Sequence, residues 1–202
     1  MINHRIGPFA VLAACALTLT LTGCSESNSA SSVAATSPAA AAAATTSSAL
    51  ESESAPIPTD ASPKSSAASE SAKLTVTDVR VGEHEGFDRV VYELGGKGTP
   101  GWRVAYVDEA VQDGSGKTIP VSGNGILQVQ IDGSAYPFDS DVEGYSGPNP
   151  VPGVPGGTVT EVNGALVFEG VTQSFIGVTQ PDRPFTVSTL SDPTRVVVDV
   201  AK

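Results

Sequence analysis

The string in this chain that most resembles a chemical motif is Gly116-Lys117-Thr118, which matches the end of a phosphate-binding P-loop. A P-loop needs another glycine five residues before the second one, and that position holds Val111. It also needs a helix after the lysine, whose first amide groups bind the phosphate. Pro120 and a glycine-rich stretch follow instead, so no helix is expected. The sequence predicts no nucleotide site, and predicts a turn at residues 113–116 that follows a strand.

A second polar string, DSDVEG at residues 139–144, places oxygen-bearing side chains at alternate positions, as the first half of a calcium loop does. Its ligands would be Asp139, Asp141 and Glu143. A complete loop would need a bidentate glutamate at position 150, which is Pro150, so the EF-hand pattern fails. A looser calcium site stays open as the alternative to a polar loop. We predict no bound metal and no cofactor.

The residues needed for hydrolytic catalysis are scarce in this sequence. Beyond the first few residues His84 is the only histidine, and it cannot by itself build a zinc amidase site. It is also the only histidine base for a serine nucleophile, and the chain has no Gly-x-Ser-x-Gly motif. Carboxylates are numerous, but no spacing marks a glycosidase pair. We therefore predict a protein that is not an enzyme and has no catalytic residues.

Aromatic side chains suit a different task, since they stack on sugar rings. The residues that we expect to bind such a ligand are Trp102, Tyr106, Tyr136 and Tyr145, with Phe138 as a further loop aromatic. Trp102 and Tyr106 share one face of a predicted strand. The alternative to ligand binding is that Trp102, as the only tryptophan, lies in the core of the sandwich. Tyr136 and Tyr145 bracket the acidic loop and are expected to be the exposed pair.

The N-terminus has the pattern of an export signal. His4 and Arg5 precede an apolar run at residues 9–21, which is too short to cross a bilayer stably. The sequence Leu-Thr-Gly-Cys that ends at Cys24 resembles the lipobox of bacterial lipoproteins. We therefore predict a signal peptide at 1–23 and acylation of the Cys24 thiol, palmitate included, which anchors the protein to the extracytoplasmic face of the membrane. The alternative is an ordinary secretory signal with an incidental cysteine.

Composition then divides the chain in two. Residues 24–72 are almost entirely Ser, Ala, Thr, Pro and Glu, which cannot bury a core, so we predict a lipidated cysteine followed by a disordered tether. Residues 73–202 carry short alternating apolar runs separated by turn residues, with a bulge near Asp78 and a hairpin at Asn163-Gly164. They predict an all-β domain, a single β-sandwich of about eight or nine strands with a long ordered loop at 136–157. The runs are 74–81, 89–94, 102–107, 126–131, 159–162, 165–168, 174–179, 185–190 and 195–200.

Four of these segments resemble the AMIN-like domain of actinobacterial lipoproteins over about residues 74–200. They are GFDRVVYEL at 86–94, PGWRVAYV at 100–107, QSFIGVTQ at 173–180 and PFTVSTLSDPTRVVVDV at 184–200. The resemblance implies a β-sandwich module of the cell envelope, in a family related to domains that localise amidases and secretin-type assemblies through contact with peptidoglycan. It supplies no catalytic residues to carry over.

The charge of the chain limits its partners. The formal net charge is -11, which disfavours nucleic acid because a phosphate backbone needs a basic face. We therefore expect a membrane-anchored envelope lipoprotein whose domain binds peptidoglycan or another envelope glycan without catalysis. The alternative is an adaptor that holds an envelope enzyme or assembly through protein contacts.

Overall fold

The computed structural model describes residues 55–202. The predicted signal peptide (1–23), the acylation site Cys24 and the first part of the predicted tether (24–54) lie outside the described residues. Within residues 55–202, no helix has the length and apolar character needed to cross a membrane.

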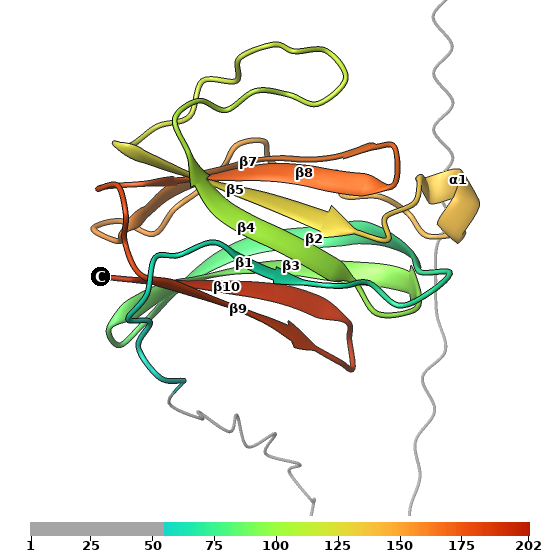
Figure 1. Ribbon diagram of the computed structural model, residues 1–202, viewed down its shortest axis with the longest axis horizontal. Helices are drawn as coiled ribbons and strands as arrows, with labels where there is room; N and C mark the ends of the chain where they lie inside the picture. Colours follow the sequence, from blue (N-terminus) through green and yellow to red (C-terminus); the bar gives the residue numbers. More distant parts are fainter. Residues whose placement is uncertain (1–54) are drawn as a thin grey trace, which may run out of the picture. The chain divides into compact units, whose positions relative to one another are not determined.

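Two antiparallel sheets pack face to face and form a β-sandwich (Figure 1). One sheet has six strands in the order β1-β4-β5-β8-β7-β6, and the other has four in the order β2-β3-β10-β9. This confirms the predicted all-β sandwich, with two further short strands, β1 and β6. The strands are β1 (Lys64–Ser66), β2 (Lys73–His84), β3 (Phe87–Lys97), β4 (Gly101–Val107), β5 (Gly125–Asp132), β6 (Val151–Pro152), β7 (Val159–Phe168), β8 (Val171–Val178), β9 (Phe185–Leu190) and β10 (Arg195–Ala201).

The core lies between the sheets and follows from strand alternation, because successive side chains point to opposite faces. In β5, Leu127, Val129 and Ile131 are fully buried while the glutamines between them are only partly covered. Several polar contacts join the two sheets, and the most deeply buried pair of hydroxyl groups, those of Tyr92 on β3 and Ser174 on β8, are 3.0 Å apart. Tyr92 is fully buried, so this hydrogen bond satisfies a hydroxyl that water cannot reach.

The predicted bulge is confirmed. The register between β2 and β3 shifts between Val76 and Asp78, so that Thr77 is the extra residue. The insertion lets both Val76 and Val79 face the core, although they are three positions apart and strict alternation would place them on opposite faces. The predicted turn at 113–116 is also confirmed, as the tip of a small loop closed by an isolated bridge between Val111 and Thr118.

The hairpin predicted at Asn163-Gly164 is wrong, because both residues lie inside the continuous strand β7. There the chain forms a bulge, with a register shift between Gly164 and Leu166. The Asn163 amide donates to the Glu161 carboxylate at 2.6 Å, so its side chain is engaged within the strand. The actual turn is Glu169-Gly170, where φ is 47° and 81°, as two-residue hairpin turns with positive φ at both positions require.

The last part of the predicted tether, before residue 73, packs on the domain. Strand β1 pairs antiparallel with β4, in the register Lys64 to Val104. Farther along, the Ser69 amide donates to the Thr99 carbonyl at 3.0 Å. Gly101 lets this segment approach closely, since a Cβ there would lie 2.3 Å from the Ala68 nitrogen. Backbone hydrogen bonds and small side chains hold residues 64–69 on the domain. These features leave no alternating apolar pattern in the sequence.

Candidate functional site

The four aromatic residues predicted to bind a ligand separate in the structure. Trp102 lies in the core with 9% of its surface exposed, and its indole Nε1 donates to Thr189 Oγ1 on the opposite sheet at 3.1 Å. We therefore correct its assignment: Trp102 joins the two sheets and is not available to stack on a sugar.

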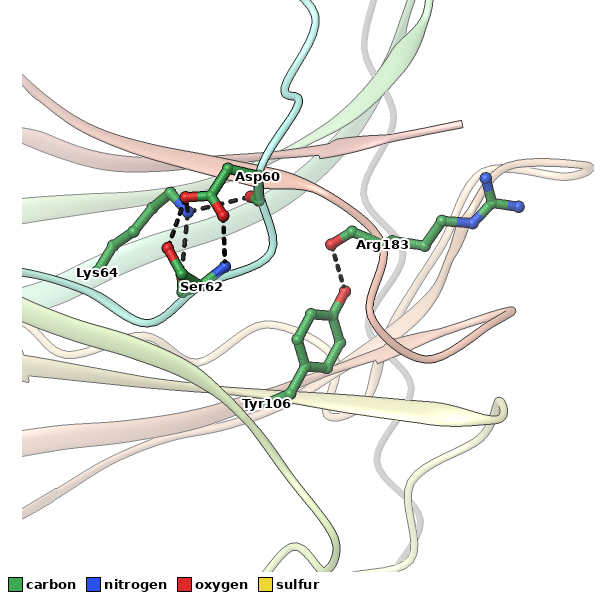
Figure 2. Close-up of polar contacts among 5 residues, drawn as sticks. All are labelled: Asp60, Ser62, Lys64, Tyr106 and Arg183. Carbon is green, nitrogen blue, oxygen red and sulfur yellow. Dashed lines mark hydrogen bonds and ion pairs between the residues drawn. The ribbon is translucent and has the colours of Figure 1, made fainter.

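Tyr106, at the end of β4, is half-buried. Its hydroxyl donates to the backbone carbonyl of Arg183 at 2.8 Å (Figure 2). Its ring meets the Phe185 ring edge-on, with centroids 5.8 Å apart. Burial raises the pKa of the Tyr106 hydroxyl to about 12. The residue borders a polar depression of about 600 Å³ whose lining includes Asp108 and Asp182, but its own polar group is already used by the fold.

Tyr136 and Phe138 form the most exposed aromatic surface in the described part of the chain, and we call this pair the aromatic platform. Tyr136 is 40% exposed and Phe138 is 78% exposed. Their rings are stacked, with centroids 5.4 Å apart and an interplanar angle of 5°. The pair lies at the start of α1 (Pro137–Ser140), a single turn that Pro137 favours because its fixed φ suits a first helical position.

The loop that carries the platform is fixed to the sandwich on both sides. Before it, the Ala135 amide donates to the Leu74 carbonyl at 2.8 Å. Within α1, the Ser140 hydroxyl lies 2.6 Å from that of Thr75. After it, the Tyr145 amide donates to the Val76 carbonyl at 2.8 Å. The platform therefore has a rigid base, and α1 lies at one end of the sandwich, next to β2 and β5 (Figure 1).

Tyr145 does not join Tyr136 in an exposed pair as expected. Its hydroxyl donates to the Pro148 carbonyl at 2.8 Å, and its ring packs against the core cluster. Partial burial raises the pKa of this hydroxyl. Tyr145 thus fixes the loop, and the partner of Tyr136 is Phe138. Pro137 between them was the available signal, because it indicates a tight turn that brings the flanking rings together.

The three acidic residues of the same loop do not form a metal site. Asp139, Asp141 and Glu143 are all exposed, and no group of three or more metal-ligating side chains gathers anywhere in residues 55–202. Asp141 ends α1 in a left-handed conformation, with φ 57°. The structure gives the looser calcium alternative no support. Asp139 within α1 and Asp141 at its end provide exposed hydrogen-bond acceptors on the turn that carries the platform.

These features define a class of protein: a two-sheet β-sandwich whose accessible surfaces for binding are a rigid aromatic loop and shallow depressions. Residues 74–202 match the family model of the AMIN-like domain, and the chain belongs to that family. Membership indicates a domain associated with peptidoglycan in the cell envelope. No curated protein and no solved structure matches the chain. The family match begins at Leu74, so β1 precedes it.

Proposed function

We propose that this protein is a non-catalytic envelope lipoprotein, held on the outer face of the cell membrane by acylated Cys24, whose domain binds peptidoglycan or another envelope glycan. The observation that carries the proposal is the aromatic platform. A phenylalanine side chain exposed to 78% leaves a large apolar face in water at a free-energy cost. The C–H face of a sugar ring covers such a face well.

The surroundings of the platform suit a carbohydrate. Sugar hydroxyl groups donate hydrogen bonds, and the carboxylates of Asp139 and Asp141 are exposed acceptors on the same turn. The anchored loop also holds both rings in position before a ligand arrives, which lowers the entropy lost on binding. The lack of a catalytic role is supported by His84, which stacks on the Phe87 ring at 4.9 Å and hydrogen-bonds to no nucleophile within residues 55–202.

Co-sedimentation of the full chain, purified in detergent, with insoluble cell wall tests the proposal. We expect Phe138→Ala to weaken wall binding about tenfold, because it removes about 1.5 kcal/mol of ring stacking. The matched control is Leu166→Ala on β7, which removes another exposed apolar side chain, 50% exposed, and should leave binding unchanged. Equal binding by the wild-type chain and Phe138→Ala would refute the platform as the glycan site.

The anchor has its own test. In cells that export the protein, Cys24→Ser should move it from the membrane fraction to the soluble fraction, because the serine hydroxyl does not accept the lipid. Retention of the variant in membranes would contradict anchoring through Cys24.

A further inference from the structure

The outer face of the four-stranded sheet carries a depression of about 250 Å³ that three arginines surround. Arg80 comes from β2, Arg89 from β3 and Arg195 from β10. These three strands are neighbours in the sheet, so residues distant in sequence become adjacent. The chain has a net charge of -11 and only six arginines, and half of them gather here.

The floor of this arginine depression is apolar. Val91 on β3 is paired with Arg80 on one side and with Val197 on the other, which makes a row across three strands. Gly82, paired with Arg89, leaves a gap in the surface, since a Cβ at Gly82 would meet no atom within 4 Å. The depression therefore combines cationic walls with a small apolar base.

Two of the arginines are held by carboxylates that lie outside the depression. Arg89 donates from Nε and Nη2 to both oxygens of Asp199, at 2.7 and 2.8 Å. These hydrogen bonds raise the pKa of the Arg89 guanidinium. Arg80 donates from Nη1 to Asp78 at 2.8 Å and to Glu93 at 3.2 Å. The pairings orient both guanidinium groups, and no acidic side chain lines the depression itself.

Arg195 is different, because it has no carboxylate partner among residues 55–202. It donates from Nε to the Pro193 carbonyl at 3.0 Å and from Nη2 to the Ser191 carbonyl at 3.2 Å. Its Nη1, like that of Arg89, makes no hydrogen bond within the described chain. The three arginines are balanced in charge by Asp78, Glu93 and Asp199, but Arg195 is in no ion pair in this part of the chain and several guanidinium N–H donors remain unused. Unused guanidinium donors are the chemistry that recognises an anion.

We infer that the arginine depression binds a carboxylate flanked by a small apolar group, and that its ligand is the peptide stem of peptidoglycan. The inference rests on the proposed function and assigns it a second contact. Uncharged sugar rings offer the unused guanidinium N–H groups no charged acceptor, whereas a stem peptide ends in a carboxylate beside methyl-bearing residues. The guanidinium groups donate hydrogen bonds to the carboxylate, and Val91 and Val197 contact the methyl groups. At about 250 Å³ the depression is near the lower limit of roughly 300 Å³ for small-molecule sites, which suits a dipeptide end.

Arginine-selective NMR tests this inference directly. The full chain, labelled with ¹⁵N-arginine and held in detergent, gives few Nε–Hε signals because it has only six arginines. The probe is N-acetyl-D-alanyl-D-alanine, titrated beside its C-terminal amide and inorganic phosphate. We expect the acid to shift the signals of Arg80, Arg89 and Arg195, and the amide and phosphate to shift them at least tenfold more weakly at equal concentration.

Three variants locate the site. Arg195→Gln should weaken binding of the acid about tenfold, since it removes the one guanidinium of the three that is not held in an ion pair. Gly82→Leu should abolish binding by filling the depression, and open space at Gly82 lets the chain fold with it. Arg103→Gln is the matched control, because Arg103 lies on the other sheet in an ion pair with Asp132 at 2.7 Å. Its affinity for the acid should equal that of the wild type.

The outcomes separate this inference from the proposed function. Equal shifts with the amide or with phosphate, or no shift of the Arg195 signal, would overturn the carboxylate site even if the chain sediments with walls. A chain that shows the arginine shifts but loses no wall binding in Phe138→Ala would overturn the platform and support the arginine depression.

Discussion

At the scale of single residues, Asp88 is the clearest case of a charge that the fold requires. It is fully buried, and its Oδ2 accepts hydrogen bonds from the backbone amides of Thr158 and Val159. Its other oxygen makes no hydrogen bond but lies 3.7 Å from the Lys202 ammonium. Gly157 allows this approach, since a Cβ there would lie 2.4 Å from Oδ2. One carboxylate therefore fixes the start of β7 to β3.

We expect Asp88→Ala to lower the free energy of unfolding by about 3 kcal/mol, because two buried amides lose their acceptor. Urea unfolding followed by circular dichroism measures this change. The comparison variant is Asp139→Ala, whose exposed carboxylate makes no hydrogen bond in the described chain, and which should unfold at nearly the same urea concentration as the wild type. If both variants lose equal stability, Asp88 does not have this role.

At the scale of elements, Gly101 decides whether β1 can pair with β4. A Cβ at this position would lie 2.8 Å from the Ser66 carbonyl oxygen and closer still to the Ala68 nitrogen. Gly101→Ala should therefore release residues 64–69 from the edge of β4, at a cost of about 1–3 kcal/mol. Hydrogen–deuterium exchange should show faster exchange in that segment, with the core strands still protected. Gly82→Ala, which meets open space, is the control. Unchanged exchange of the segment in Gly101→Ala would contradict this packing.

The long strands could be predicted from the sequence, because alternating apolar residues indicate which face of a strand is buried. Residues 126–131 and 195–200 were predicted within one residue of β5 and β10 at each end. Strands β1 and β6 were missed, since short edge strands with polar or small side chains carry no such alternation. The hairpin predicted at Asn163-Gly164 is wrong because the pairing of β7 with β8 outweighs the local turn preference of these two residues.

The candidate sites could be predicted only in part, and the reason is again the arrangement of elements. Tyr136 was identified from its place in a long loop, but its stacking with Phe138 depends on the turn at Pro137. The arginine depression could not have been predicted. Arg80 and Arg195 are brought together by the order β2-β3-β10, which local patterns do not determine.

At the scale of the whole molecule, opposite charges are paired at several places on an acidic protein. Asp60 accepts hydrogen bonds from Ser62 and Lys64 (Figure 2), and its backbone carbonyl accepts the Phe185 amide at 3.0 Å. Glu83 pairs with Lys202 near the other end of the described chain. The Asp60 carbonyl and the Glu83–Lys202 ion pair fasten the two ends of residues 55–202 to the sandwich, and the Asp60 carboxylate orders the turn that leads into β1. Protonation of the two carboxylates should therefore loosen both ends.

The stability of the folded state depends on pH because the pKa values of Asp60 and Glu83 are lowered by folding. Hydrogen bonds from Ser62, then from Lys64, hold the pKa of Asp60 at about 2, and the Lys202 ammonium lowers the pKa of Glu83. A carboxyl with a lowered pKa in the folded state adds stability above its unfolded pKa, about 4, and loses it as the pH falls through the folded value. We therefore expect the melting temperature to fall between about pH 4 and pH 2, and Asp60→Asn to flatten part of that fall. Differential scanning calorimetry of both chains measures it. Protonation also relieves repulsion among the other acids, so the difference between the two profiles isolates Asp60, and identical profiles would show that it contributes nothing.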